Sequence, residues 1–294
     1  MTHPLFRHRL ALLALRAVAR LPLPVLHWIG AVAGRIAFAF SPKLRERMLD
    51  NIRVSGVAGP GEAALLRFGR DCARELGRGL LEVLPFWCGR TEEMLARIRT
   101  DSSWDAARTM ATAGRGVIFL SPHVGCFEAA GQFLSEHLPI TIMYREPRLT
   151  WLNPLLRAGR TRGKAHVIAA DSRGVRALLK ALRHGDPIGL LPDQVPVQGG
   201  GVMADFFGRP AYTTTLVGKL QKSTGAAIFL ICAERLPRAQ GYALTFHPLE
   251  TLPEDDRAAA QALNRAVEAI IRRCPEQYLW TYNRYKQPTP AAGT

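Results

Sequence analysis

The stretch GVIFLSPHVGCFEAAG, residues 116–131, decides the fold class. Residues 116–120 form a short apolar run of the kind that a buried strand shows. Ser121 and Pro122 follow, and these residue types are favoured at a helix N-cap and at the first helical position. The pattern therefore predicts a helix over about 124–136, with His123 in its first turn. A strand that leads directly into a helix is the repeating step of an α/β fold.

The same step recurs towards the C-terminus. Apolar runs predict strands at 139–144, 165–169 and 187–191, and helical spacing predicts helices at 151–161 and 172–184 between them. Strands separated by helices of this length imply right-handed crossovers and parallel pairing. The sequence thus predicts an α/β fold with a mostly parallel central sheet flanked by helices. The other expected elements are helices at 45–56, 61–87, 92–112 and 255–275 and strands at 226–236 and 242–250.

Length and composition indicate one folded α/β domain, residues 41–294, behind an N-terminal segment, residues 1–40. The 294 residues are 48% hydrophobic and 21% charged, which excludes a disordered chain. The five cysteines form no C-x-x-C pair, so neither a disulfide framework nor a zinc site is indicated. No sequence motif calls for a metal or another cofactor.

Positive charge is concentrated in two segments. Residues 1–53 carry nine Lys and Arg against two acidic residues, a formal +7, and residues 145–183 carry ten against two, a formal +8. Fields of this kind suit anionic membrane lipids, an acidic protein or a phosphorylated substrate. Nucleic acid is not expected as a partner, because the sequence has no Walker loop, RNP motif or zinc-finger spacing.

The first basic segment is also apolar. Within residues 5–40, Arg9, Arg16 and Arg20 share one helical face at ~100° per residue, which is typical of a helix lying in a membrane interface. Two prolines interrupt the segment, and its second half falls short of the ~20 uninterrupted apolar residues of a spanning helix. We therefore expect residues 1–40 to form a membrane anchor of amphipathic helices. A hairpin packed on the protein's own core and a cleaved signal peptide are the alternatives.

Three expected strand ends carry reactive or charged side chains. In parallel α/β sheets, ligands bind at the carboxyl ends of the strands, so these side chains predict one site. His123 and Glu128 follow the strand at 116–120. The other members are Arg145, Asn153 and Arg160, after the strand at 139–144, and Asp193 and Gln194, after the strand at 187–191.

The pair His123 and Glu128 indicates acid–base chemistry. Near the positive end of a helix dipole His123 is expected to be neutral, as a general base must be. Positions i and i+5 are about 140° apart on a helix, so the two side chains meet only if His123 bends back from the loop edge. Glu128 would then hold one ring nitrogen while the other accepts a proton from a hydroxyl. The sequence does not identify the donors for a developing oxyanion, and backbone N–H groups near Gly125 are candidates.

Four blocks in this order resemble a known family. They are HVGCFE (123–128), which matches an H-x4-D/E motif, YREPRLTWLNPLLRAGR (144–160), LLPDQVPVQGGGVMADFFGRPAYTTT (190–215) and QYLWTYNRYK (277–286). Over about residues 5–286 the chain resembles the bacterial lipid A biosynthesis acyltransferases, the lauroyl/myristoyl transferases of the lysophospholipid acyltransferase superfamily.

The resemblance implies transfer of an acyl chain from a thioester, usually on acyl carrier protein, to a hydroxyl of a glycolipid at the cytoplasmic face of the inner membrane. By this likeness His123 is the base, Glu128 is its partner, and Arg160 and Asp193 line the substrate site. Arg145 and Arg160 would neutralise phosphate groups. The family often has DQD or DQN where this chain has DQV, which leaves the identity of the acceptor open.

Other functions stay open at this point. Cys126, near a predicted helix start, could serve a thiol-dependent thioester hydrolase, because a helix N-terminus lowers the pKa of a thiol. A buried cysteine is the simpler interpretation, since no third catalytic residue is evident. An acyltransferase acting on another lysolipid or on an aminolipid is a further alternative. So is a membrane-binding protein without catalytic activity.

Overall fold

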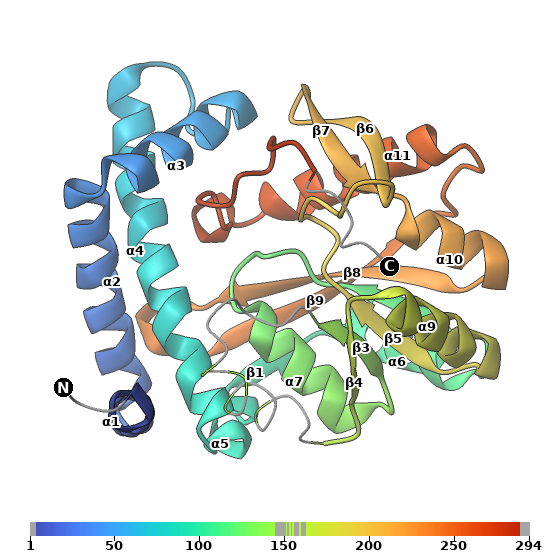
Figure 1. The fold of residues 1–294 in the computed structure, drawn as a ribbon, viewed down its shortest axis with the longest axis horizontal. Coiled ribbons are helices and arrows are strands. Elements are labelled where there is room, and N and C mark those ends of the chain that lie inside the picture. The colour runs from blue at the N-terminus through green and yellow to red at the C-terminus, as the bar shows by residue number, and fades with distance from the viewer. Residues whose placement is uncertain are drawn as a thin grey trace.

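The computed structural model describes residues 4–144 and 163–288, together with positions 151, 153, 155 and 159. Within these residues seven strands form one sheet in the order β1-β9-β8-β2-β5-β3-β4 (Figure 1), and each neighbouring pair in it is parallel except β8 with β9. The predicted fold class is confirmed. The strands are β1 (Ile98–Thr100), β2 (Val117–Leu120), β3 (Thr141–Tyr144), β4 (His166–Ala169), β5 (Pro187–Leu190), β8 (Ala227–Arg235) and β9 (Tyr242–Leu249).

Helices surround this sheet, and α1 to α4 stand together at one end of the molecule (Figure 1). A separate antiparallel hairpin, β6 (Gly201–Phe206) with β7 (Arg209–Thr214), follows β5 in the chain. The helices are α1 (Pro4–Ala19), α2 (Leu23–Phe40), α3 (Pro42–Ser55), α4 (Glu62–Trp87), α5 (Thr91–Leu95), α6 (Ser102–Thr112), α7 (Phe127–His137), α9 (Ser172–His184), α10 (Leu216–Thr224) and α11 (Asp256–Ile271).

The structure differs from the expected elements in two places. The single helix expected over 92–112 is wrong: α5 and α6 flank the short strand β1, and the Asp101 side chain caps α6 by accepting a 3.0 Å hydrogen bond from Ser103 N. The hairpin β6–β7 was not predicted. The helix expected over 151–161 lies largely outside the described residues.

The core lies on both faces of the sheet, as the alternation along β2 shows. Ile118 and Leu120 belong to one buried cluster, whereas Val117 and Phe119 belong to another. Successive side chains of a strand point to opposite faces, so a fully buried strand must be apolar at every position. This is why the run at 116–120 shows no polar alternation.

Helix α2 packs closely on α4 because small residues face each other. A Cβ on Gly34 would stand 1.9 Å from the carbonyl oxygen of Ala73, and one on Gly77 would stand 1.8 Å from that of Gly30. Larger side chains cannot fit between the two backbones. Helix α2 therefore packs directly against α4, as expected for the alternative in which the N-terminal hairpin packs on the protein's own core.

A buried charge cluster ties the same helices to the sheet. The Glu82 carboxylate on α4 accepts hydrogen bonds from Arg235 on β8, with Nε at 2.7 Å, and contacts Nε2 of His27 on α2 at 2.9 Å. Arg235 also bonds Glu75 at 2.6 Å, and Tyr242 donates to Glu82 at 3.3 Å. We call these five residues the Glu82 cluster. Buried charges are stable only when paired and hydrogen-bonded, as here.

The opposite side of α2 exposes an apolar stripe made of Val25, Trp28, Val32, Ile36 and Phe40, spaced three or four residues apart. Trp28 is 68% exposed and Phe40 is 83% exposed. Among the described helices, α2 is the one whose length and composition would allow it to cross a membrane, since its 18 residues have a mean hydropathy of 1.5. However, 39% of this helix is buried inside the protein.

Candidate active site

A cavity of about 650 Å³ lies at the carboxyl edge of the sheet. Its described wall includes His123 after β2, Gln194 after β5, Met143 on β3 and Asp171 after β4. These strands are consecutive in the sheet, in the order β2-β5-β3-β4. At about 4.8 Å per strand spacing, the cavity extends across some 14 Å of the sheet edge.

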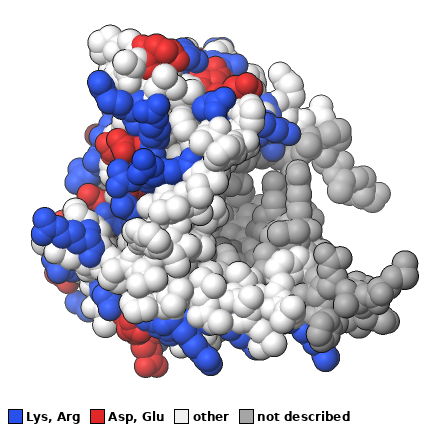
Figure 2. Space-filling model, turned by 90° about the vertical axis from the view of Figure 1, so that its left-hand side faces the viewer, with Lys and Arg blue, Asp and Glu red and all other residues white. Residues whose placement is uncertain are grey.

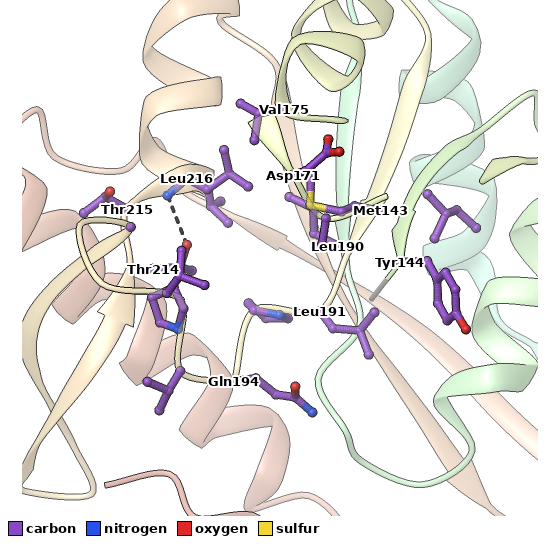
Figure 3. Close-up of a pocket in the computed structure, with 18 of the residues that line it drawn as sticks. Met143, Tyr144, Asp171, Val175, Leu190, Leu191, Gln194, Thr214, Thr215 and Leu216 are labelled. Atoms are coloured by element: carbon purple, nitrogen blue, oxygen red, sulfur yellow. Dashed lines mark hydrogen bonds between the residues drawn. The ribbon is translucent and has the colours of Figure 1, made fainter. Parts of the chain in front are cut away.

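The cavity is lined mainly by apolar side chains, with polar side chains among them. Figure 3 shows Met143, Leu190 and Val175 together on one side of the space. Residues 214–216 lie across from them, at the start of α10, where Leu216 N donates a 3.2 Å hydrogen bond to Oγ1 of Thr214. Such a mixture of an apolar lining with few polar groups is typical of a small-molecule site.

His123 lies in a loop, not in a helix as predicted. Helix α7 begins at Phe127 with Cys126 as its N-cap residue. The helix cannot begin before Gly125, because the φ of Gly125 is +62°, outside the helical range. The Gly125 backbone also passes so close to Ala233 that a Cβ would stand 1.8 Å from the Ala233 oxygen. The loop is instead bonded like an extra strand, with Gly125 N donating to Gln277 O at 3.0 Å and Cys126 N to Ala233 O at 2.8 Å. These two N–H groups, the candidates for oxyanion donors, already have acceptors within the protein.

The carboxylate beside His123 is that of Asp193. Oδ1 of Asp193 lies 2.9 Å from His123 Nδ1, and Oδ2 accepts a 3.1 Å hydrogen bond from the His123 backbone N–H. Asp193 is only 3% exposed. Burial by itself raises the pKa of Asp193, but the charge of His123 and its two hydrogen bonds outweigh burial and lower that pKa below its usual value. Asp193 is therefore ionised at neutral pH.

This partner fixes the proton on the imidazole. An ionised carboxylate only accepts hydrogen bonds, so Nδ1 of His123 carries a proton, and in the neutral ring the lone pair is on Nε2. The amide Nε2 of Gln194 lies 3.1 Å from His123 Nε2, in place to donate to it. Gln194 also lines the cavity, where Figure 3 shows it at the edge opposite Val175. His123 thus presents a basic nitrogen on the cavity side.

The expected contact between Glu128 and His123 is wrong in this geometry, because Asp193 and Gln194 hold the two ring nitrogens. Glu128 lies in the first turn of α7 and is buried. It accepts a 3.3 Å hydrogen bond from Nε2 of Gln132, which also donates to the Gly159 carbonyl at 3.0 Å. Glu128 and Gln132 both line the cavity. Glu128 is therefore a cavity carboxylate separate from the imidazole pair.

The other predicted site residues divide into three groups. Gln194 lines the cavity, and Asp193 contacts His123, as just described. Arg145 and Arg160 lie outside the described residues, so their expected phosphate contacts stay predictions. Asn153 is described and half-buried, and it is not among the described residues of the cavity wall.

A family model, bacterial lipid A biosynthesis acyltransferase, matches residues 5–287 of the chain. The chain belongs to this family. The resemblance inferred from the four sequence blocks is thereby confirmed, and the protein is an acyltransferase of the lipid A biosynthesis type.

Similar proteins carry the same family name. The acyltransferase is 26% identical over 269 residues to the lipid A biosynthesis palmitoleoyltransferase of Escherichia coli (strain K12), covering 91% of this chain and 87% of that protein. It is 25% identical over 275 residues to the lipid A biosynthesis lauroyltransferase of the same organism, covering 92% and 88%. A lipid A biosynthesis acyltransferase of Haemophilus influenzae is 31% identical over 173 residues, covering 57% of this chain and 52% of that protein.

The C-terminal segment of the acyltransferase, residues 275–284, holds both loops of the site. Besides Gln277 bonding Gly125, Leu279 N donates to His123 O at 3.0 Å, and the Tyr282 hydroxyl accepts from Val195 N at 2.9 Å. Sequence reasoning noted this aromatic block but gave it no role. The many aromatic residues just after the last helix were the sequence feature that could have indicated a structural role for this segment.

Cys126 does not have the properties of a nucleophile in this acyltransferase. Its side chain is buried, and it is not among the described cavity residues. Burial and the nearby charge of Glu82 raise the pKa of its thiol well above the usual value. A protonated, inaccessible thiol is unreactive.

Proposed function

We propose that this acyltransferase transfers a fatty acyl chain from a thioester on acyl carrier protein to a hydroxyl of a lipid A precursor, at the cytoplasmic face of the inner membrane. The observation that carries the proposal is the buried His123–Asp193 pair at the wall of a large apolar cavity. Membrane association and the glycolipid acceptor accord with the family.

In the proposed reaction His123 Nε2 accepts the proton of the acceptor hydroxyl while the hydroxyl oxygen attacks the thioester carbonyl. A tetrahedral oxyanion forms and collapses, the carbon–sulfur bond breaks, and the leaving sulfur takes the proton from His123. Asp193 stabilises the imidazolium formed between these steps, because it is already ionised and bonded to Nδ1.

Gln194 has two functions in this scheme. Its amide occupies the position beside Nε2 where the acceptor hydroxyl must arrive, so it marks the docking point for that hydroxyl. When displaced from Nε2, the same N–H₂ group can donate to the oxyanion, whereas the described backbone N–H groups at 123, 125 and 126 already have acceptors. We assign Gln194 as the oxyanion donor.

Helix α9 is the proposed docking face for the acidic carrier. Arg173, Arg176, Lys180 and Arg183 lie three or four residues apart along it, and among its residues none is acidic. Its N-terminal turn, with Ser172 and Val175, forms part of the cavity wall. A carrier bound along α9 would therefore stand beside the cavity entrance.

The acceptor is proposed to arrive from the membrane at the other end of the molecule. The apolar stripe of α2 lies on the face shown in Figure 2, where a broad uncharged area has lysine and arginine atoms along its margins. An apolar surface with a basic rim suits insertion into an anionic lipid interface.

The direct test is an assay of the purified protein in vesicles, with acyl carrier protein thioester as donor and a lipid A precursor as acceptor. We expect an ester product, detected by mass spectrometry as the acceptor mass plus one acyl group. Transfer to a lysolipid or an aminolipid, but not to the lipid A precursor, would replace the proposed acceptor. Thioester hydrolysis that depends on Cys126 and yields no ester would refute acyl transfer.

A further inference from the structure

The wall of the cavity has a gap on α7. Glu128, Gly131 and Gln132 all line the cavity, and their spacing places them on one helical face. Apart from its chain neighbours and the adjacent backbone of α7, no described atom lies within 4 Å of the position that a Cβ on Gly131 would take. The helix therefore lacks a side chain at a point where the cavity offers room for one.

Close packing accounts for other helical glycines of this protein but not for Gly131. A Cβ on Gly174 would stand 1.9 Å from the Ala169 oxygen, and Gly34 and Gly77 are restricted in the same way by the facing helix. Glycine is unfavourable inside a helix compared with alanine. Gly131 thus weakens α7 without relieving a contact among the described residues, and the open space it leaves belongs to the cavity.

The side chains that share this cavity with Gly131 are largely apolar. They include Ile142 and Met143 from β3, Leu190 from β5 and Val175 from α9. Figure 3 shows Met143, Leu190 and Val175 directed towards a common space. Such a lining favours a hydrocarbon chain over a sugar or a phosphate.

We propose that the cavity holds the acyl chain of the donor and that Gly131 sets the length of chain the enzyme accepts. This inference rests on the proposed function. The chain begins at the thioester carbonyl beside His123, because that carbon must meet the acceptor oxygen there. From this point it runs past Gly131 into the apolar interior. A side chain added at Gly131 takes the place of methylene groups of the substrate.

The experiment compares Gly131→Ala and Gly131→Leu with the wild type on a series of carrier-bound saturated acyl thioesters of increasing length. Ala106→Leu on α6 is the control, since this exposed helical position lies away from the cavity. Gly131→Leu should move the optimum of kcat/KM to shorter donors. It should also lower kcat/KM for the longest accepted donor at least ~10-fold relative to kcat/KM for the shortest. The reason is that one methylene in an apolar pocket changes discrimination between substrates about 10-fold or more. Gly131→Ala should shift the optimum less, and Ala106→Leu should leave the profile unchanged.

Equal loss on every donor, or an unchanged profile in Gly131→Leu protein with wild-type thermal stability, would overturn the proposal. Calorimetric binding of free saturated fatty acids of the same lengths to His123→Ala protein gives a second readout that needs no turnover. If the wild type transfers acyl groups but neither readout depends on Gly131, the inference alone is wrong. If the wild type transfers none while the length preference for fatty acids still shifts with Gly131, the chain site stands and the proposed reaction fails.

Discussion

At the scale of single residues, the site depends on the contact between His123 and Asp193. The imidazole is held at 2.9 Å by a buried carboxylate whose pKa is lowered. A carboxylate in that position orients the ring, selects the Nδ1–H tautomer and stabilises the imidazolium. In the proposed reaction Asp193 is thus a positioning residue that acts through His123.

The first prediction follows from these roles. His123→Ala should lower kcat by about 10² or more, the usual contribution of a positioned general base, and Asp193→Asn should lower kcat by about 10² with little change in KM. Cys126→Ala should keep most of the activity. Steady-state kinetics with carrier thioester and lipid acceptor gives these values. An inactive Cys126→Ala enzyme beside an active His123→Ala enzyme would establish the thiol mechanism instead.

A second residue-scale prediction concerns Glu128, whose catalytic role stays a prediction now that Asp193 and Gln194 hold the ring nitrogens of His123. If the Glu128 carboxylate contacts substrate, Glu128→Gln should lower kcat/KM, because the amide keeps an oxygen to accept from Gln132 but carries no charge. Wild-type kcat/KM in Glu128→Gln would show that the carboxylate charge has no part in the reaction.

Residue types predicted His123 as the base, but they did not predict its partner. His123 and Glu128 are five residues apart and drew attention as a motif, whereas Asp193 is 70 residues away from His123. Sequence spacing carries information about neighbours on one helix or strand. The meeting of two loops at a sheet edge depends on strand order, which places β5 beside β2.

At the scale of elements, α2 has two faces with different roles. One is fixed to α4 and to the Glu82 cluster through His27, and the other is the apolar stripe. Deleting residues 1–40 would uncover α4 and leave Glu82 without one of its partners. Surface substitutions therefore test membrane binding better than truncation.

The third prediction is that Trp28→Glu combined with Ile36→Glu weakens binding to anionic phospholipid vesicles at least ~10-fold, because each change removes an exposed apolar side chain and adds a charge that acidic lipids repel. Vesicle sedimentation measures it. Met203→Glu, at another exposed apolar position, on β6, should bind like the wild type. Full retention of the double variant on vesicles would assign the membrane contact to another surface.

The fourth prediction concerns the Glu82 cluster, which joins α4, β8 and α2. Burial raises the pKa of Glu82, but Arg235 and His27 outweigh burial and lower it from 4.5 to about 2. A carboxyl group with a lowered folded-state pKa stabilises the fold above its usual pKa and loses that contribution as pH falls to the folded value. Glu82→Gln should therefore reduce the free energy of unfolding by about 3 kcal/mol at neutral pH, and the difference from wild type should shrink between pH 4.5 and 2.

Denaturant unfolding across that pH range measures the effect. Glu92→Gln, the same change at an exposed position of α5, should give a difference near zero throughout. A Glu82→Gln difference that stays constant with pH would mean that packing, and not the charge of Glu82, stabilises the cluster.

Elements with strong local signals were predicted well, and those made by long-range pairing were not. Helix α9 has the predicted bounds because Asp171 caps it and Gly185, with a φ of +92°, ends it. Strand β1 has three residues and exists through its pairing with β9. In the hairpin, Gly201 and Gly208 suggested a loop, and the apolar Met203 interrupts the polar alternation that a strand with one buried face usually shows, although in the structure Ala204 and Phe206 are buried.

At the scale of the whole molecule, two groups of helices that carry basic side chains lie apart. The helices α1 to α4 stand at one end, and α9 lies towards the other, beside the cavity (Figure 1). In the proposed function this arrangement would let a membrane-bound acceptor and a carrier-bound donor approach from different sides.

The last prediction separates donor docking from chemistry. Arg173 is 86% exposed at the side chain, and Arg176 lies three residues along the same helix. Reversing both to glutamate should raise the KM for the carrier-bound donor about 10-fold at low salt and leave kcat nearly unchanged, because exposed charges steer association and their effect is screened over about 8 Å at physiological ionic strength. The defect should therefore shrink as salt is added.

Arg99→Glu with Arg115→Glu makes the same charge change at exposed positions in β1 and before β2, and it should leave the donor KM close to wild type. Because the membrane is also anionic, vesicle binding is measured in parallel: an unchanged donor KM together with weakened vesicle binding would make α9 a lipid-facing helix and place the carrier elsewhere.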